Sequence, residues 1–94
     1  MGQLFDQIRA AVRADRFYVS DHADERLRER GILAWHVIAG LEQGRLLSER
    51  PSDKPNPSVE VDQVLPDGTS ILAVWAYWRD MAAAKLVTVP FYDR

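Results

Sequence analysis

The apolar pattern of this chain changes its period at Gly44, and this change limits the possible folds more than any other feature. Before Gly44, apolar residues recur three or four positions apart, as on one face of an α-helix. After Gly44, short apolar and β-branched runs lie between turn residues, as in strands. Helices grouped before strands favour an α+β fold over a parallel α/β sheet.

Three helices are expected in the first part of the chain. The first covers residues 2–15, with its apolar side facing a core. The second begins at Ser20 or Asp21, which both suit a helix N-cap, and it ends before Gly31, which suits the left-handed position after a helix. The third covers residues 34–43 and ends at a glycine.

The remaining segments predict a small sheet. Those with strand character are 17–19, 45–49, 58–65, 71–78 and 86–92. The first of them is short and also fits an extended lead-in. Residues 51–58 hold three prolines and predict an exposed loop, residues 66–68 predict a hairpin turn, and residues 80–85 predict a connection. We therefore expect N-terminal helices packed on a three- to four-stranded antiparallel sheet.

Composition limits the chemistry available to the chain. At 94 residues the chain predicts one domain over residues 1–94. The absence of cysteine excludes disulfides, thiol catalysis and cysteine-bound zinc, and two histidines alone are a poor zinc set, so no metal or cofactor is expected. Neither a signal peptide nor a membrane-spanning stretch is found, which predicts a cytoplasmic protein. The net charge of -2 argues against a large nucleic-acid footprint.

The second predicted helix carries the main candidate site. His22, Arg26 and Arg30 are spaced four residues apart, so they lie near one face of a helix. Imidazole exchanges protons near neutral pH, and guanidinium groups bind phosphate or carboxylate. This face therefore predicts either a catalytic surface or a plain solvated one.

A stripe of basic residues runs along the first predicted helix. Arg9, Arg13 and Arg16 lie opposite its apolar side. A solvated face explains the stripe, and a docking surface for an acidic partner or RNA is the more specific alternative.

Other candidates are weaker. His36 in the third helix suits packing or solvent contact better than catalysis. Glu60 and Asp62 share one strand face, where a solvated sheet explains them better than a paired acid and base. Trp75 and Trp78 point to opposite strand faces, and an exposed Trp78 favours a protein interface.

Residues 18–92 resemble the DUF4258 family of bacteria and archaea. The residues that carry the resemblance are Ser20-Asp21-His22-Ala23, Arg26, Glu29-Arg30-Gly31-Ile32, Val37, Leu41, Gly44, Pro51, Asp53, Pro55, Pro57-Ser58 and Val87-Thr88-Val89. The chain departs from the family pattern at Leu33, where a helix-capping residue is usual, and at Pro90, which precedes Phe91 and Tyr92.

The resemblance implies a layout similar to the RelE/ParE-like small toxins, with helices packed on a curved antiparallel sheet. It also implies a toxin-like module of a toxin–antitoxin pair, with a cognate antitoxin as partner. Some family members stand beside a zinc-finger or helix-turn-helix antitoxin.

Metal-independent RNA cleavage is the chemical hypothesis for this chain. His22 would act as general base or acid, while Arg26 and Arg30 would hold the phosphate and its developing charge. A further hydrogen-bond donor or base-stacking ring would come from a tyrosine, namely Tyr18, Tyr77 or Tyr92.

Two other functions remain open at this point. Arg26 can pair with Asp21 or Glu29, and Arg30 can pair with Glu29 or cap the carbonyls at the end of the helix. Such pairs would leave little positive charge for a phosphate. The chain would then be a non-catalytic protein-interaction domain of the same fold. A nucleic-acid binder without cleavage is the remaining alternative, and the sequence defines no oligomeric state.

Overall fold

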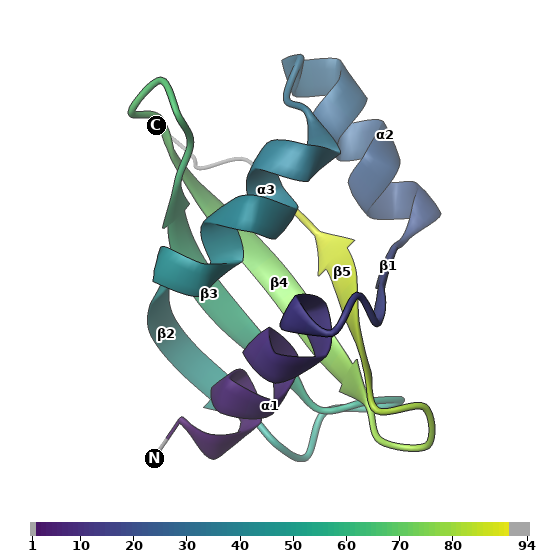
Figure 1. Ribbon diagram of the computed structural model, residues 1–94. Coiled ribbons are helices and arrows are strands. Elements are labelled where there is room, and N and C mark those ends of the chain that lie inside the picture. Colours follow the sequence, from purple (N-terminus) through teal and green to yellow (C-terminus); the bar gives the residue numbers. More distant parts are fainter. Residues whose placement is uncertain (1, 91–94) are drawn as a thin grey trace.

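Helices precede most of the strands in an α+β fold, as the sequence predicts (Figure 1). The computed structural model describes residues 2–90. The helices are α1 (Gln3–Arg13), α2 (Asp21–Arg30), α3 (Ala34–Gly40) and the short 3₁₀ helix η1 (Leu41–Gln43). The strands are β1 (Phe17–Val19), β2 (Arg45–Arg50), β3 (Ser58–Val64), β4 (Ser70–Trp78) and β5 (Ala83–Thr88).

The strands form one sheet in the order β1-β5-β4-β3-β2. Neighbours from β2 to β5 pair antiparallel, whereas β1 pairs parallel with β5. The expected three to four antiparallel strands are therefore corrected to a five-stranded mixed sheet. The reason is that β1 and β5 lie near opposite ends of the sequence, so no local pattern reports their pairing.

Two predicted boundaries are also corrected. The third helix is α-helical to Gly40 and then tightens into η1. The last strand begins at Ala83, inside the segment predicted as a connection, and ends at Thr88. The turn before it is shorter than expected because Ala82 takes a left-handed conformation with φ 48°.

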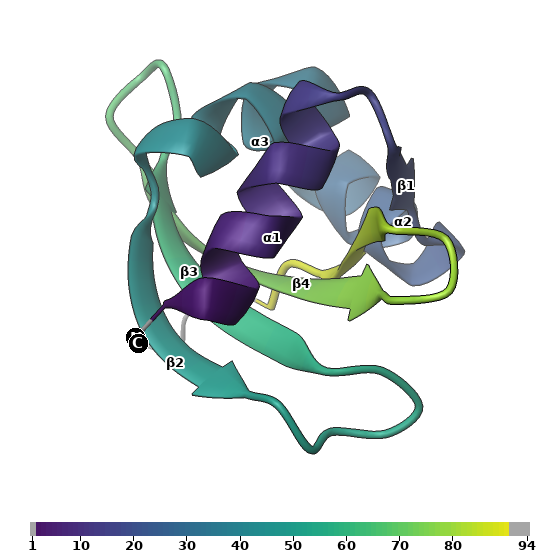
Figure 2. The ribbon, with the colours of Figure 1, turned by 60° about the horizontal axis from the view of Figure 1, so that its bottom comes forward.

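The three helices cover one face of the sheet, which curves around them (Figure 2). Val59 and Val61 are buried on this face, while Glu60 points to the other side, as the alternating pattern predicts. We call that other side, which also carries Val74 and Lys85, the helix-free face.

Trp75 is the largest fully buried side chain in the described residues and needs a partner for its indole N–H. Its Nε1 donates a hydrogen bond to Gln63 Oε1 at 3.0 Å. Gln63 Nε2 in turn donates to the carbonyl oxygen of Val37 at 2.8 Å. This buried chain of hydrogen bonds links β4, β3 and α3.

Gly44 ends the helical part of the chain, as predicted, and the structure shows why this position is glycine. Its φ of -68° is open to any residue. A Cβ atom at this position would lie 2.5 Å from Val61 Cγ1. Glycine is therefore required because the chain passes close over β3.

Candidate functional site

Helix α2 begins at a cap that also ties it to the sheet. Ser20 is the N-cap, and its Oγ accepts a hydrogen bond from the Ala23 amide at 2.9 Å. The same hydroxyl donates to the carbonyl oxygen of Val87 at 2.7 Å. The first turn of α2 is therefore held at a fixed position against the end of β5.

The end of α2 is fixed as firmly. Gly31 lies in the left-handed region with φ 67°, as the sequence predicts. Its amide donates to Arg28 O at 3.1 Å, and the Ile32 amide donates to Leu27 O at 2.9 Å. These two bonds form a Schellman motif, which satisfies carbonyls that would otherwise lack partners.

One narrow side of α2 faces the core. Ala23 and Leu27 are buried there and pack in the main apolar cluster. His22 and Arg30 are exposed, and Arg26 is half-buried. The predicted row therefore lies beside the core-facing side of α2, with Arg26 partly covered.

The three predicted residues are spread along α2 rather than gathered around one point. Since the rise per residue is about 1.5 Å, His22 and Arg30 start about 12 Å apart along the helix axis. Such a row suits successive phosphates of a strand better than one enclosed substrate.

Arg30 also lines a hollow of 450 Å³ together with His36 and Asp67. A hydrogen bond from the Thr69 amide holds the pKa of Asp67 below its ordinary value.

Ion pairs run along α2 between neighbouring turns. Arg26 lies 3.7 Å from Glu29, one of the two pairings that the sequence allows for it. Arg28 lies 3.1 Å from Asp24. The Arg26–Glu29 pair is one that the interaction-domain alternative expects. Because the Arg26 side chain is exposed to 38% and that of Arg28 to 80%, these pairs contribute little stability, and a phosphate would compete with the carboxylates for the arginines.

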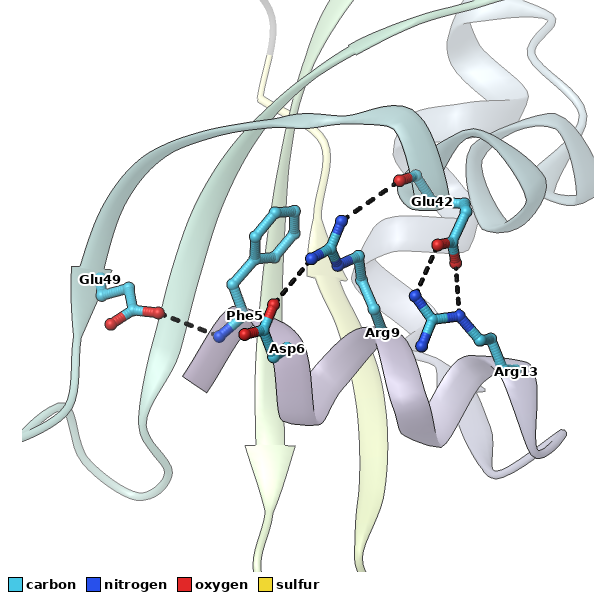
Figure 3. A network of polar contacts seen from close by, with 6 residues as sticks. All are labelled: Phe5, Asp6, Arg9, Arg13, Glu42 and Glu49. Atoms are coloured by element: carbon cyan, nitrogen blue, oxygen red, sulfur yellow. Dashed lines mark hydrogen bonds and ion pairs between the residues drawn. The ribbon is translucent and has the colours of Figure 1, made fainter. Parts of the chain in front are cut away.

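The basic stripe near α1 is bound differently (Figure 3). Arg13 forms a two-pronged pair with Glu42, with Nε and Nη2 at 2.9 Å and 2.5 Å from the two carboxylate oxygens. These hydrogen bonds, reinforced by the charge of the partner, lower the pKa of Glu42 and raise that of Arg13. The pair connects α1 to η1.

Arg9 and Arg16 are also held by internal acceptors. Arg9 donates to Asp6 at 2.7 Å and to the carbonyl oxygen of Glu42 at 3.4 Å, and it lies over the Phe5 ring at 4.4 Å (Figure 3). Arg16 Nε donates to Ala82 O at 3.0 Å. The predicted partner-binding role of the stripe stays untested, but all three guanidinium groups already have partners within the fold.

The remaining candidates fall in different places. Tyr77 packs against the core cluster, whereas Tyr18 is exposed on the helix-free face. Tyr92 lies outside the described residues. Glu60 pairs with Arg50 at 2.8 Å, so it belongs to a cross-strand ion pair as the simpler interpretation expects.

The sequence did not reveal a second cluster on the helix-free face. The Tyr18 and Trp78 rings lie 5.3 Å apart, and Lys85 Nζ lies 5.1 Å from the Trp78 ring centroid. The three residues come from three different strands. The parallel pairing of β1 with β5 brings them together, and that pairing leaves no local signal.

The pattern of residues along the chain matches a known family. A family model described as a domain of unknown function (DUF4258) matches residues 19–90. The chain belongs to the DUF4258 family. No curated protein and no solved structure matches the chain. The DUF4258 match covers α2 and all five strands except the first two residues of β1, and it leaves α1 outside.

Two further findings on this DUF4258 chain concern metal ions and membranes. Within residues 2–90, no group of three or more His, Asp or Glu side chains is placed to hold a metal ion. No helix in the same range is long and apolar enough to cross a membrane.

Proposed function

We propose that this chain is a toxin-like module of a toxin–antitoxin pair, and that it acts on RNA through the side of α2 that carries His22, Arg26 and Arg30. The observation that carries the proposal is the double hydrogen bond of Ser20. It fixes the first turn of α2 to β5, so the exposed His22 starts from a rigid element. Functional groups on rigid elements keep the geometry that catalysis requires.

Metal-independent cleavage is the reaction that suits these groups. His22 would accept the proton of a ribose 2′-hydroxyl, and the 2′ oxygen would attack the adjacent phosphorus. The bond to the 5′ oxygen would break, and that oxygen would take a proton from water. Arg26 would stabilise the charge that develops on the phosphate, and Arg30 would hold the next phosphate along the strand.

Induced expression in a bacterial host tests this function. We expect the wild type to arrest growth and a variant with His22→Ala and Arg26→Ala to lose the effect. Arg28→Ala is the matched control, because this exposed arginine of the same helix lies outside the proposed face. The toxin proposal fails if the wild type does not arrest growth, and the α2 assignment fails if the double variant is as toxic as the wild type.

A non-catalytic interaction domain is the second candidate function, and a specific surface favours it. Leu33, Trp35 and Val64 are exposed, with Trp35 exposed to 65%. Trp35 and Val64 line a hollow of 430 Å³ between α3 and the β3–β4 turn. Exposed aromatic groups beside a hollow are typical of protein interfaces. This function would be favoured if Trp35→Ser abolished the growth effect and the α2 double variant did not.

A further inference from the structure

The helix-free face carries an aromatic pair that the core does not use. Tyr18 and Trp78 are tilted by 39° to one another, and Tyr18 is exposed to 44%. Lys85 stands opposite Tyr18 in the parallel pairing and reaches over the Trp78 ring. Two aromatic rings with a cation beside them form a surface on which a nucleic-acid base can stack.

A hollow of 520 Å³ opens beside the same tryptophan. It is lined by Trp78, Arg79 and Asp80 and by the loop 55–57. With the oxygen and nitrogen of its side-chain amide exchanged, Asn56 accepts a hydrogen bond from Trp78 Nε1 at 2.7 Å. This bond holds the indole in place. The volume lies in the range of small-molecule sites, about 300–1,000 Å³. The hollow therefore offers room for a small polar group beside a held aromatic ring.

Cations of the helix-free face lie near this hollow. Lys54 and Lys85 are the two lysines of the chain, and both line a second hollow of 190 Å³ on the helix-free face. Within residues 2–90, neither lysine forms an ion pair. Asp53 lines this hollow too, but its carboxylate accepts a hydrogen bond from Ser58 Oγ at 2.6 Å. The lysines can therefore meet phosphate groups in a chain whose net charge is negative.

We propose that this surface is a binding site for single-stranded RNA, in which a base stacks on Trp78 and Tyr18 and a phosphate contacts Lys85. The inference deepens the proposed function, on which it rests, because it identifies where the RNA is held. Tyr18 precedes His22 by four residues, so their Cα atoms lie within about 14 Å of one another. Because β1 is the edge strand of the sheet, an RNA strand stacked on the aromatic pair would reach the first turn of α2 by passing around the β1 edge.

Binding of a labelled RNA tests the site. The probe is a fluorescent hexa-adenylate with 2′-O-methyl groups, which cannot be cleaved through its 2′ oxygen, and the readout is anisotropy. We expect Trp78→Leu to weaken binding about fivefold or more, as loss of one stacked base does. Lys85→Gln should weaken binding and reduce the dependence of log affinity on log salt by about 0.7 for a lost phosphate contact.

Matched variants keep the test independent of folding. Trp35→Leu removes a more exposed tryptophan far from the site, and Arg28→Gln removes a cation from α2; both should bind the RNA as the wild type does. The proposal is overturned if the wild type does not bind the hexamer, or if Trp78→Leu and Lys85→Gln bind it as tightly as the wild type. It is also overturned if adenosine monophosphate binds as tightly as the hexamer, because the site would then serve a free nucleotide.

The same data separate this inference from the proposed function. Since 2′-O-methyl RNA is bound without reaction, its affinity reports on the aromatic site and not on the chemistry at His22. Binding that depends on Trp78 without growth arrest would support the RNA site and overturn the toxin role. Growth arrest that depends on His22, with no effect of Trp78→Leu on RNA affinity, would overturn the RNA site and leave the toxin role in place.

Discussion

Two arginine-rich parts of this DUF4258 chain use the same side chain in different ways. Around α1, Arg13 and Arg16 reach acceptors on η1 and on the turn before β5, and so connect segments far apart in the sequence. On α2, Arg26 and Arg28 pair with carboxylates one turn away on the same helix. An arginine that joins distant segments serves the fold, whereas a local, exposed pair can be exchanged for a ligand. Spacing alone does not distinguish the two, because both stripes have helical periodicity.

The largest expected effect is on catalysis. His22→Ala should reduce RNA cleavage by about 10²- to 10⁴-fold, the usual contribution of a general base or acid. The melting temperature should stay near that of the wild type because His22 is exposed. Cleavage of a labelled RNA by purified protein measures the effect, with His36→Gln as the control. Equal cleavage by wild type and His22→Ala would remove α2 from the chemistry.

The next largest effect concerns the cap that positions α2. Ser20→Ala removes the hydrogen bonds to Ala23 N and Val87 O and should lower the free energy of unfolding by about 1–2 kcal/mol. Cleavage should fall as well, since the first turn of α2 loses its side-chain bond to β5 and keeps only the backbone bond from Ser20 N to Leu86 O. Urea denaturation gives the stability, and the exposed Ser70→Ala is the control. A stable Ser20→Ala variant with full activity would show that the cap does not position the site.

Arg9 tests the structural half of the comparison. Arg9→Met keeps much of the apolar stem but loses the hydrogen bond to the distant Glu42 carbonyl, the hydrogen bond to Asp6 and the contact with the Phe5 ring. We expect a loss of about 1 kcal/mol in the free energy of unfolding and no change in RNA affinity. Arg28→Met, whose side chain is exposed to 80%, should change stability by less than about 0.5 kcal/mol. If the two variants were equally stable, the distinction between α1 and α2 would not hold.

The smallest effect is a dependence on pH. Because Arg13 lowers the pKa of Glu42 in the folded chain, the pair stabilises the fold above the ordinary carboxyl range and loses its effect as pH falls through the lowered pKa. Glu42→Gln should therefore melt below the wild type at pH 7, and the difference should shrink below about pH 4. Thermal melts of both proteins across this range measure it. A difference that grows on acidification would contradict the assigned shift.

Local signals in the sequence were sufficient for α2. Ser20 and Gly31 mark its ends because capping and left-handed backbone depend on the residue itself. The alternation of Val59, Glu60 and Val61 likewise predicted which side of β3 is buried. The shared side of α2 that carries His22, Arg26 and Arg30 followed directly from the predicted ends of the helix.

Long-range pairing is what the sequence did not reveal. Ala83 and Ala84 give no β-strand signal, yet they open β5 because that strand fills the gap between β1 and β4. The contact of Tyr18 with Trp78 depends on the same pairing. The partners of Arg13 and Arg16 depend on tertiary structure too, so helical spacing could not show that this stripe is already bound.

One measurement tests the central claim, that α2 carries the function and the arginines around α1 carry the fold. RNA cleavage and the melting temperature should be measured side by side for Arg26→Ala and Arg13→Ala. The account predicts that Arg26→Ala loses cleavage and melts near the wild type, whereas Arg13→Ala keeps cleavage and melts at a lower temperature. Loss of cleavage in Arg13→Ala at full stability, with an active Arg26→Ala, would contradict it and place the function on the α1 stripe.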